Sequence, residues 1–90
     1  MEHIDIAALP QRVGASVTIA GWVATTRSSG KIAFVVVRDG SGYLQCVVSK
    51  RDVAESIWEA CLSLTHETSV RVDGVVRADA RSPGGVELTV

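Results

Sequence analysis

The sequence predicts an all-β barrel of five strands, with one helix inserted between the third and the fourth strand. Three observations support this fold class. Apolar residues alternate with a period of two in several short segments, which is the pattern of half-buried strands. Valine, a residue that favours strands, is abundant in these segments. One internal stretch instead spaces its apolar residues three and four apart, as on one face of a helix.

A short helix is expected at the start of the chain, from His3 to Leu9, where the apolar residues have helical spacing. Asp5 is a candidate cap for its first turn, and Pro10 follows the helix directly. Gly14 then marks the turn into the first strand.

The first strand is expected over residues 17–23, where the period is two. Gly21 lies inside it, and a glycine there indicates a bulge or the sharp bend that a small barrel needs. The tight turn at residues 28–31 predicts that the second strand, Ile32 to Val37, pairs antiparallel with the first. The hairpin turn Asp39-Gly40-Ser41-Gly42 then leads to the third strand, Tyr43 to Ser49.

Helical spacing follows from Asp52 to Leu62, with Arg51 or Asp52 near the N-terminal cap. The apolar face of this helix is expected to comprise Val53, Ile57, Trp58, Cys61 and Leu64. Alternation returns from Ser69 to Ala78, which predicts the fourth strand. A turn at residues 82–85 precedes the fifth strand, which begins at Val86.

Three strands, a helix and two strands follow the order of the OB-fold, a five-stranded Greek-key barrel that binds oligonucleotides. We expect all five strands to be antiparallel and the helix to plug one end of the barrel. The 90 residues make one domain, residues 1–90, and leave no room for a second.

Composition narrows the function classes. With 47% apolar and 21% charged residues, the chain can bury a core. The net charge of −1 argues against a strong non-specific nucleic-acid binder, because such proteins carry a basic patch. It is compatible with a domain that reads a few exposed bases. The sequence has no phosphate-binding loop and no nucleophile elbow, so neither an enzyme active site nor a cofactor is expected.

Cysteines and the N-terminus bear on the cellular compartment. Cys46 and Cys61 belong to no zinc-binding pattern and are expected to be buried free thiols. The acidic start of the chain lacks the apolar run of a signal peptide. No stretch approaches the roughly 20 apolar residues of a membrane span. These features predict a cytoplasmic protein. Trp22 and Trp58 are expected to be packing residues.

Four residues in or between the first three strands are candidates for binding RNA bases. Phe34 either faces outward, where its ring can stack on a base, or packs into the core with the opposite pleat. Gln45 interrupts an apolar strand and is either a reader of a base edge or an ordinary solvent-facing amide. Arg27 and Lys31 flank the first turn, where they either contact bases and phosphates or are merely solvated.

Several short motifs together carry a resemblance to a known family. They are Gly21-Trp22-Val23, Arg27, Gly30-Lys31-Ile32, Phe34, Arg38-Asp39-Gly40-Ser41-Gly42, Gln45, residues 72–77 and Gly85-Val86-Glu87. In this spacing they resemble the N-terminal anticodon-binding domain of class IIb aminoacyl-tRNA synthetases, over essentially all of the chain. Residues 27–32 resemble the asparaginyl branch most, followed by the aspartyl branch.

The resemblance implies a role for each matching residue. It implies that Phe34 stacks on the middle anticodon base, a uracil, and that Gln45 hydrogen-bonds the same base. It further implies that Arg27 contacts these bases and that Glu87 lies near the first anticodon base, where a carboxylate suits the edge of guanine. The implied partner is the anticodon loop of a tRNA.

The sequence also departs from the family pattern. Family members often carry a basic cluster before Arg27, where this chain has Ala24, Thr25 and Thr26, so we expect weaker phosphate contacts. The catalytic domain of the family is absent from these 90 residues, so the chain by itself is not expected to be an enzyme. Two alternatives stay open: a generic single-strand binder, and a protein-interaction scaffold that has lost RNA binding.

Overall fold

The computed structural model describes residues 2–81 and 85–90, with the side chains of residues 2 and 3 excepted. The predicted turn at residues 82–85 falls mostly outside these residues. The elements in chain order are β1 (Glu2–His3), η1 (Ile6–Gln11), β2 (Ser16–Ser29), β3 (Ile32–Arg38), β4 (Tyr43–Ser49), η2 (Lys50–Asp52), α1 (Glu55–Leu62), β5 (Ser69–Ala78) and β6 (Val86–Thr89).

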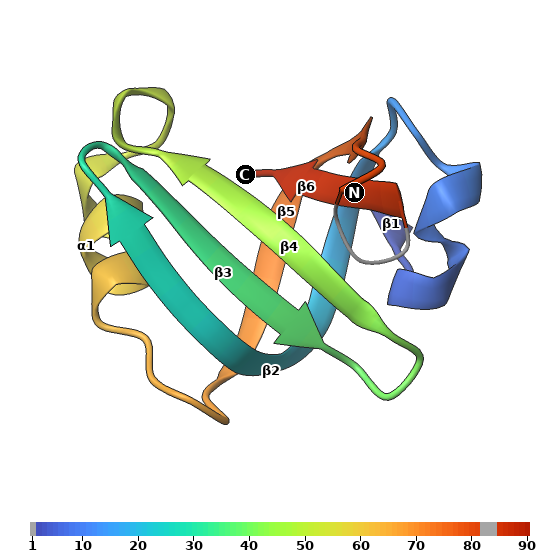
Figure 1. Ribbon diagram of the computed structural model, residues 1–90, viewed down its shortest axis with the longest axis horizontal. Coiled ribbons are helices and arrows are strands. Elements are labelled where there is room, and N and C mark those ends of the chain that lie inside the picture. Colours follow the sequence, from blue (N-terminus) through green and yellow to red (C-terminus); the bar gives the residue numbers. More distant parts are fainter. Residues whose placement is uncertain (1, 82–84) are drawn as a thin grey trace.

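Five of these strands close into a barrel in the order β2-β3-β4-β6-β5, with β5 paired back to β2. The OB-fold is thereby confirmed, with α1 between the third and the fourth barrel strand. The two-residue strand β1 is an addition that pairs parallel with β2. Figure 1 shows α1 at one end of the barrel and the N-terminal segment, coloured blue, at the other.

The expectation that all barrel strands are antiparallel is wrong for one pairing, because β4 and β6 run parallel. The reason is geometric. Strand directions cannot alternate all the way around a closed ring with an odd number of strands, so at least one neighbouring pair must be parallel. In this barrel the parallel pair is the one that brings Gln45 opposite Glu87.

A sharp bend lets the long strand β2 serve two neighbours. Its first half pairs with β5 and its second half with β3, and both ladders meet at Trp22. Gly21 stands at this junction, where a Cβ atom would lie 2.3 Å from the carbonyl oxygen of Arg38. A bulge follows between Val23 and Thr25. The bend predicted from Gly21 is therefore present, and the close approach of the two backbones explains why a residue without a Cβ atom stands there.

The N-terminal helix differs from its prediction. It is a 3₁₀ helix that begins at Ile6 and runs through Pro10 to Gln11, whereas His3 belongs to β1. Asp5 occupies the cap position without making a capping hydrogen bond. The first turn of η1 is instead capped by Asp39 of the β3–β4 hairpin, whose Oδ2 accepts the Ile6 N–H at 2.9 Å.

The second helix also begins later than predicted. Lys50–Asp52 form a 3₁₀ turn, and α1 starts at Glu55 with Ala54 at its cap position. Trp58 is buried against Ala33 and Val48, so α1 packs on β3 and β4 at one end of the barrel as expected. Ile57 does not follow the prediction, because 48% of it is exposed.

The core fills the barrel interior and fixes which residues face outward. Ala33, Val35 and Val37 are buried on β3, which leaves Phe34 on the outer face. The two alternatives for Phe34 are thus decided in favour of the outward orientation. The other buried apolar residues are Ile6, Leu9, Val17, Ile19, Val23, Leu44, Cys46, Val48, Trp58, Val76, Val86 and Leu88. Within the described ranges, no helix is long and apolar enough to cross a membrane.

Candidate nucleic-acid interface

Four strands contribute to a concave patch on the outer face of the barrel. The patch has a volume of about 500 Å³ and is lined by Arg27, Ile32, Phe34, Gln45, Val47, Asp79, Arg81 and Glu87. We refer to it as the β-face concavity. Of the five site residues predicted from the sequence, the fold brings four together here, namely Arg27, Phe34, Gln45 and Glu87. Lys31 is exposed in the β2–β3 turn and lies outside the concavity.

Strand register explains why these side chains meet. Arg27 of β2 is the direct partner of Phe34 in β3. Gln45 of β4 is the direct partner of Glu87 in β6. Phe34 pairs with Val47, two residues beyond Gln45, so the two pairs form adjacent rows on one face. A one-residue register slip in either ladder would move half of the set to the core side.

The first row holds an aromatic ring beneath a cation. The guanidinium carbon of Arg27 lies 4.5 Å from the centroid of the Phe34 ring. At an exposed site such a contact is worth about 0.5–1 kcal/mol. The contact orients the Phe34 ring, and it is weak enough for another flat group to replace it.

Polar groups gather in the second row. Gln45 and Glu87 are direct partners in the parallel β4–β6 pairing, and Asp79 lines the same concavity. Burial raises the pKa of Glu87, and the charge of the nearby Asp79 raises it further, against the opposing effects of Gln45 and Arg81. The pKa of Asp79 is lowered, first by the Arg81 backbone N–H that it accepts.

Sequence reasoning missed Asp79 and Arg81. Both lie at the end of β5 and in the turn that follows, where composition indicates only a loop. The pattern that predicted strand β5 up to Ala78 gives no sign that the next residue turns back toward β6. Asp79 does so because its N–H donates to the carbonyl of Gly85 at 2.9 Å.

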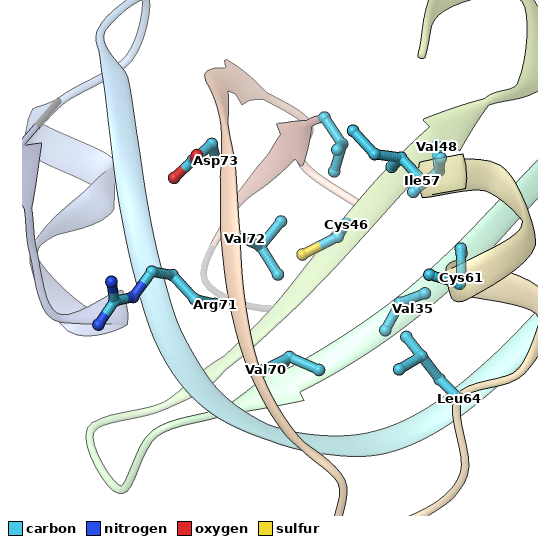
Figure 2. A pocket seen from close by; sticks show the side chains of 12 residues that line it. Val35, Cys46, Val48, Ile57, Cys61, Leu64, Val70, Arg71, Val72 and Asp73 are labelled. Carbon is cyan, nitrogen blue, oxygen red and sulfur yellow. The ribbon is translucent and has the colours of Figure 1, made fainter. Parts of the chain in front are cut away.

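A second cavity lies between α1 and β5 and is apolar. It has a volume of about 330 Å³. Val70 and Val72 point toward Cys46 and Val35 across it, whereas Arg71 on the same strand points away (Figure 2). Hydrogen-bonding groups that could orient a nucleotide are concentrated in the β-face concavity instead.

Both cysteines are free, and they line this apolar cavity. Cys46 is buried as predicted, and Cys61 is partly buried. Burial raises the pKa of Cys46 to about 12 and also raises that of Cys61, so both remain thiols at neutral pH. Across the part of the chain that the structure describes, no group of three or more His, Cys, Asp or Glu residues could hold a metal ion.

Comparison with known proteins places this fold in a family. Residues 17–90 match the OB-fold nucleic acid binding domain. The chain belongs to this family. It is 48% identical over 85 residues to the asparagine–tRNA ligase of Chloroflexus aurantiacus, which covers 94% of this chain and 19% of that protein. The chain therefore spans about one fifth of the length of such relatives.

Solved structures agree with this placement. The asparaginyl-tRNA synthetase of Pyrococcus horikoshii, complexed with asparaginyl-adenylate, aligns with a TM-score of 0.92 at 41% identity. That alignment covers 100% of this chain and 21% of the synthetase. The resemblance to the anticodon-binding domain of the asparaginyl branch is thus confirmed.

One similar structure has another kind of partner. OBody AM2EP06, solved bound to hen egg-white lysozyme, aligns with a TM-score of 0.76 at 27% identity. The alignment covers 89% of this chain and 78% of the OBody. The same barrel can therefore present a protein-binding surface in that molecule.

Proposed function

We propose that residues 1–90 form a tRNA anticodon-recognition module that reads exposed bases in the β-face concavity. The observation that carries the proposal is the convergence of an aromatic ring, an amide, a guanidinium and a carboxyl from four different strands. These groups supply a stacking surface, a donor with an acceptor, a cation and a second acceptor. Single-stranded RNA is recognised by this combination, because its unpaired bases expose both their faces and their edges.

Phe34 and Arg27 would bind the middle anticodon base by stacking. Arg27 lies over the Phe34 ring, so an incoming base either displaces the guanidinium or stacks against it. Base stacking on an aromatic ring contributes about 1–3 kcal/mol. This exceeds the value of about 0.5–1 kcal/mol for an exposed cation–π contact, so the exchange favours the base.

Gln45 would supply preference for uracil at the middle position. It lies beside Glu87 in the parallel β4–β6 pairing, and a carboxylate there favours the orientation in which the amide NH₂ is directed toward it. One N–H and the carbonyl oxygen then remain for O4 and N3–H of uracil. Cytosine presents a donor and an acceptor in the opposite order, so the same amide orientation fits it poorly.

Glu87 would read the first anticodon base. It lies next to Gln45 across the parallel β4–β6 pairing, in the same concavity. An ionised carboxylate accepts two hydrogen bonds, and the edge of guanine offers two N–H donors side by side. Neighbouring bases of one anticodon would thereby contact neighbouring rows of the barrel face.

The affinity of the isolated chain is expected to be low. Stacking and base pairing are offset by the cost of ordering the loop and of losing free motion. We expect a dissociation constant of about micromolar or weaker. The chain alone is also expected to show no amino-acid-dependent pyrophosphate exchange, because it corresponds to 19% of a ligase. Exchange above background by the purified chain would contradict this expectation.

The deciding experiment is a binding titration of the chain against anticodon stem-loops that differ only in the anticodon. The proposal requires tighter binding of a loop with uracil in the middle position than of the same loop with cytosine. Equal binding of all loops would favour a generic single-strand binder. No binding of any loop would favour the protein-interaction scaffold. Two observations support that alternative: the net charge of −1 and the similar OBody that was solved bound to lysozyme.

A further inference from the structure

Three of the four aromatic residues of the chain lie on the outer face of β2, β3 and β4. Phe34 belongs to the first row of the β-face concavity. Trp22 and Tyr43 lie outside the concavity, and 41% of Trp22 and 55% of Tyr43 are exposed. The sequence predicts Trp22 to be a packing residue, so its exposure differs from that prediction. Exposed rings of this size offer flat apolar surfaces to a ligand.

Strand register joins Trp22 and Tyr43 through Arg38. Arg38 of β3 is the direct partner of Trp22 in β2 and of Tyr43 in β4. It faces outward, because Val37 beside it is buried. Tyr43 lies two residues from Gln45 along β4, which is about 7 Å in a strand. Trp22, Arg38 and Tyr43 therefore form a third row, next to the row that holds Gln45.

The third row repeats an arrangement that is present in the first row. The guanidinium carbon of Arg38 lies 5.5 Å from the centroid of the Trp22 ring, as that of Arg27 lies 4.5 Å from the Phe34 ring. Both are cross-strand pairs of the same β2–β3 ladder, at opposite ends of it. Each pair combines an aromatic ring with a flat cation, and bases stack on both kinds of group.

A carboxylate balances the charge of the third row. The Arg38 Nη2 donates to the Glu67 Oε2 at 2.6 Å. Glu67 lies between α1 and β5, and its N–H donates to the carbonyl of Val23 at 2.8 Å, next to Trp22. Because Glu67 offsets its charge, Arg38 attracts a phosphate only weakly. The row therefore suits a neutral planar group better than a phosphate.

We propose that Trp22, Arg38 and Tyr43 form a stacking row for the unpaired base that adjoins the bases read in the β-face concavity. This inference rests on the proposed function, because it concerns the same RNA strand. Two observations favour RNA as the occupant over another protein. Residues 17–90 match a nucleic acid binding family, and the third row lies on the same strands and the same face as Phe34 and Gln45.

The third row contributes affinity and little base preference. Stacking uses the face of a base, which every base has. The exposed rings supply such surfaces, and the guanidinium of Arg38 is already engaged by Glu67. Any base at the adjoining position is therefore expected to bind about equally well.

The test uses the anticodon stem-loop with guanine at the first and uracil at the middle position. In one version the third anticodon nucleotide is abasic, and in another the nucleotide before the first position is abasic. An abasic nucleotide keeps its phosphate and loses its base. Removal of the base that reaches the third row should weaken binding about tenfold, within the range for one stacked base. Replacing it by another base should have little effect.

Variants connect this loss to the third row. Tyr43→Ala and Trp22→Ala should bind the complete loop more weakly and should lose little further affinity when the adjoining base is removed. Tyr43→Phe keeps the ring and should behave like the unmodified chain. Tyr43 is the more exposed of the two, so its variants test the row even if Trp22→Ala does not fold.

Val13→Ala is the control variant. Val13 is an exposed apolar residue, with 52% of it accessible, and it precedes Gly14, whose N–H donates to the Val76 carbonyl. Val76 is far along β5 from Ser69, the partner of Trp22. Val13→Ala should therefore respond to the abasic nucleotides as the unmodified chain does.

The outcomes separate the inference from the proposed function. If neither abasic nucleotide weakens binding, or if Tyr43→Ala responds to both as the unmodified chain does, the third row holds no base and the inference is overturned. The uracil preference, and with it the proposed function, would then still stand. A row that holds no base would favour a protein as its occupant. If the unmodified chain binds no stem-loop, the proposed function fails and the inference fails with it.

Discussion

At the scale of single residues, Phe34 and Gln45 are expected to make separable contributions to binding. Phe34→Ala should weaken binding to every stem-loop by about 1–3 kcal/mol, because stacking tolerates any base. Gln45→Ala should instead remove most of the preference for uracil over cytosine, a discrimination of about 1–3 kcal/mol by analogy with base readout in DNA. Both side chains lie on the outer face, so the barrel core is untouched.

The measurement is a double comparison in which each variant is titrated against loops with uracil or cytosine at the middle position. Thr25→Ala is a suitable control, because Thr25 is exposed on β2 and lies outside the concavity. A Phe34→Ala variant that lost only the uracil preference would contradict the assigned roles, as would a Gln45→Ala variant that weakened binding to both loops equally.

Single residues also mark the limit of what the sequence could predict about the site. Alternation along β3 and β4 predicts the outward orientation of Gln45, because successive side chains in a strand must point to opposite faces. Strand register brings Arg27 and Glu87 to the same face. Before the structure, only the resemblance to a family indicated that these two residues share a site with Gln45. The place of Asp79 and Arg81 in the concavity was not predictable, because it depends on how the chain turns after β5, where the Asp79 N–H donates to the Gly85 carbonyl.

At the scale of elements, Asp39 joins the β3–β4 hairpin to helix η1. Its carboxylate accepts the Ile6 N–H at 2.9 Å, the Ser41 N–H at 2.8 Å and the Ser41 hydroxyl at 2.6 Å. Burial alone would raise the pKa of Asp39, but the hydrogen bonds from Ser41, Ile6 and Gly42 outweigh it and the pKa is lowered. The ionised form is therefore the one that stabilises the fold.

A carboxyl group whose pKa is lower in the folded chain than in the unfolded chain stabilises the fold. This stabilisation is complete at pH values above the unfolded-chain pKa and is lost as the pH falls through the folded-chain pKa. The loss for Asp39 should thus begin at about pH 4 and continue below it. Asp39→Asn should reduce the free energy of unfolding by about 1–2 kcal/mol at neutral pH. Urea unfolding of both proteins across acid pH should show the difference shrinking as the pH falls. A constant difference would contradict the assignment.

The bend in β2 gives a second prediction for elements. A Cβ atom at Gly21 would lie 2.3 Å from the Arg38 carbonyl oxygen, so Gly21→Ala must push β2 and β3 apart. We expect a loss of about 3 kcal/mol in the free energy of unfolding. Gly30→Ala is the matched control. Gly30 has a φ of 61° and nothing within 4 Å of its added Cβ, so it should cost only about 1 kcal/mol. Equal losses in urea unfolding would show that backbone contact at Gly21 is unimportant.

The elements themselves were predictable where their cause is local. Strands and the helix follow from residue spacing, and the β2 bend follows from a glycine within a strand. The start of η1 at Ile6 was not predictable, because its capping group comes from Asp39, 33 residues away. The parallel β4–β6 pairing follows only once the strands are known to close into an odd-membered ring.

At the scale of the whole molecule, charge determines how binding responds to salt. The net charge is −1, and the cations that line the concavity are Arg27 and Arg81, with Lys31 in the adjacent turn. Arg81 is paired with Asp79, so few cations are free to contact phosphates. Under the proposed function, most of the binding energy is therefore expected to come from stacking and base-edge hydrogen bonds, which respond little to salt.

Each phosphate contact on a single strand contributes about −0.7 to the slope of log affinity against log salt concentration, so three or four contacts give about −2 to −3. Titrations of one stem-loop from about 50 to 200 mM salt measure this slope. Lys31→Gln should make the slope shallower by about 0.7 if Lys31 contacts a phosphate. Arg71→Gln is the control, because Arg71 lies on β5 beside the apolar cavity and should leave the slope unchanged. A slope steeper than about −5 would require an extensive basic surface, which this sequence does not supply, and would contradict recognition through a few exposed bases.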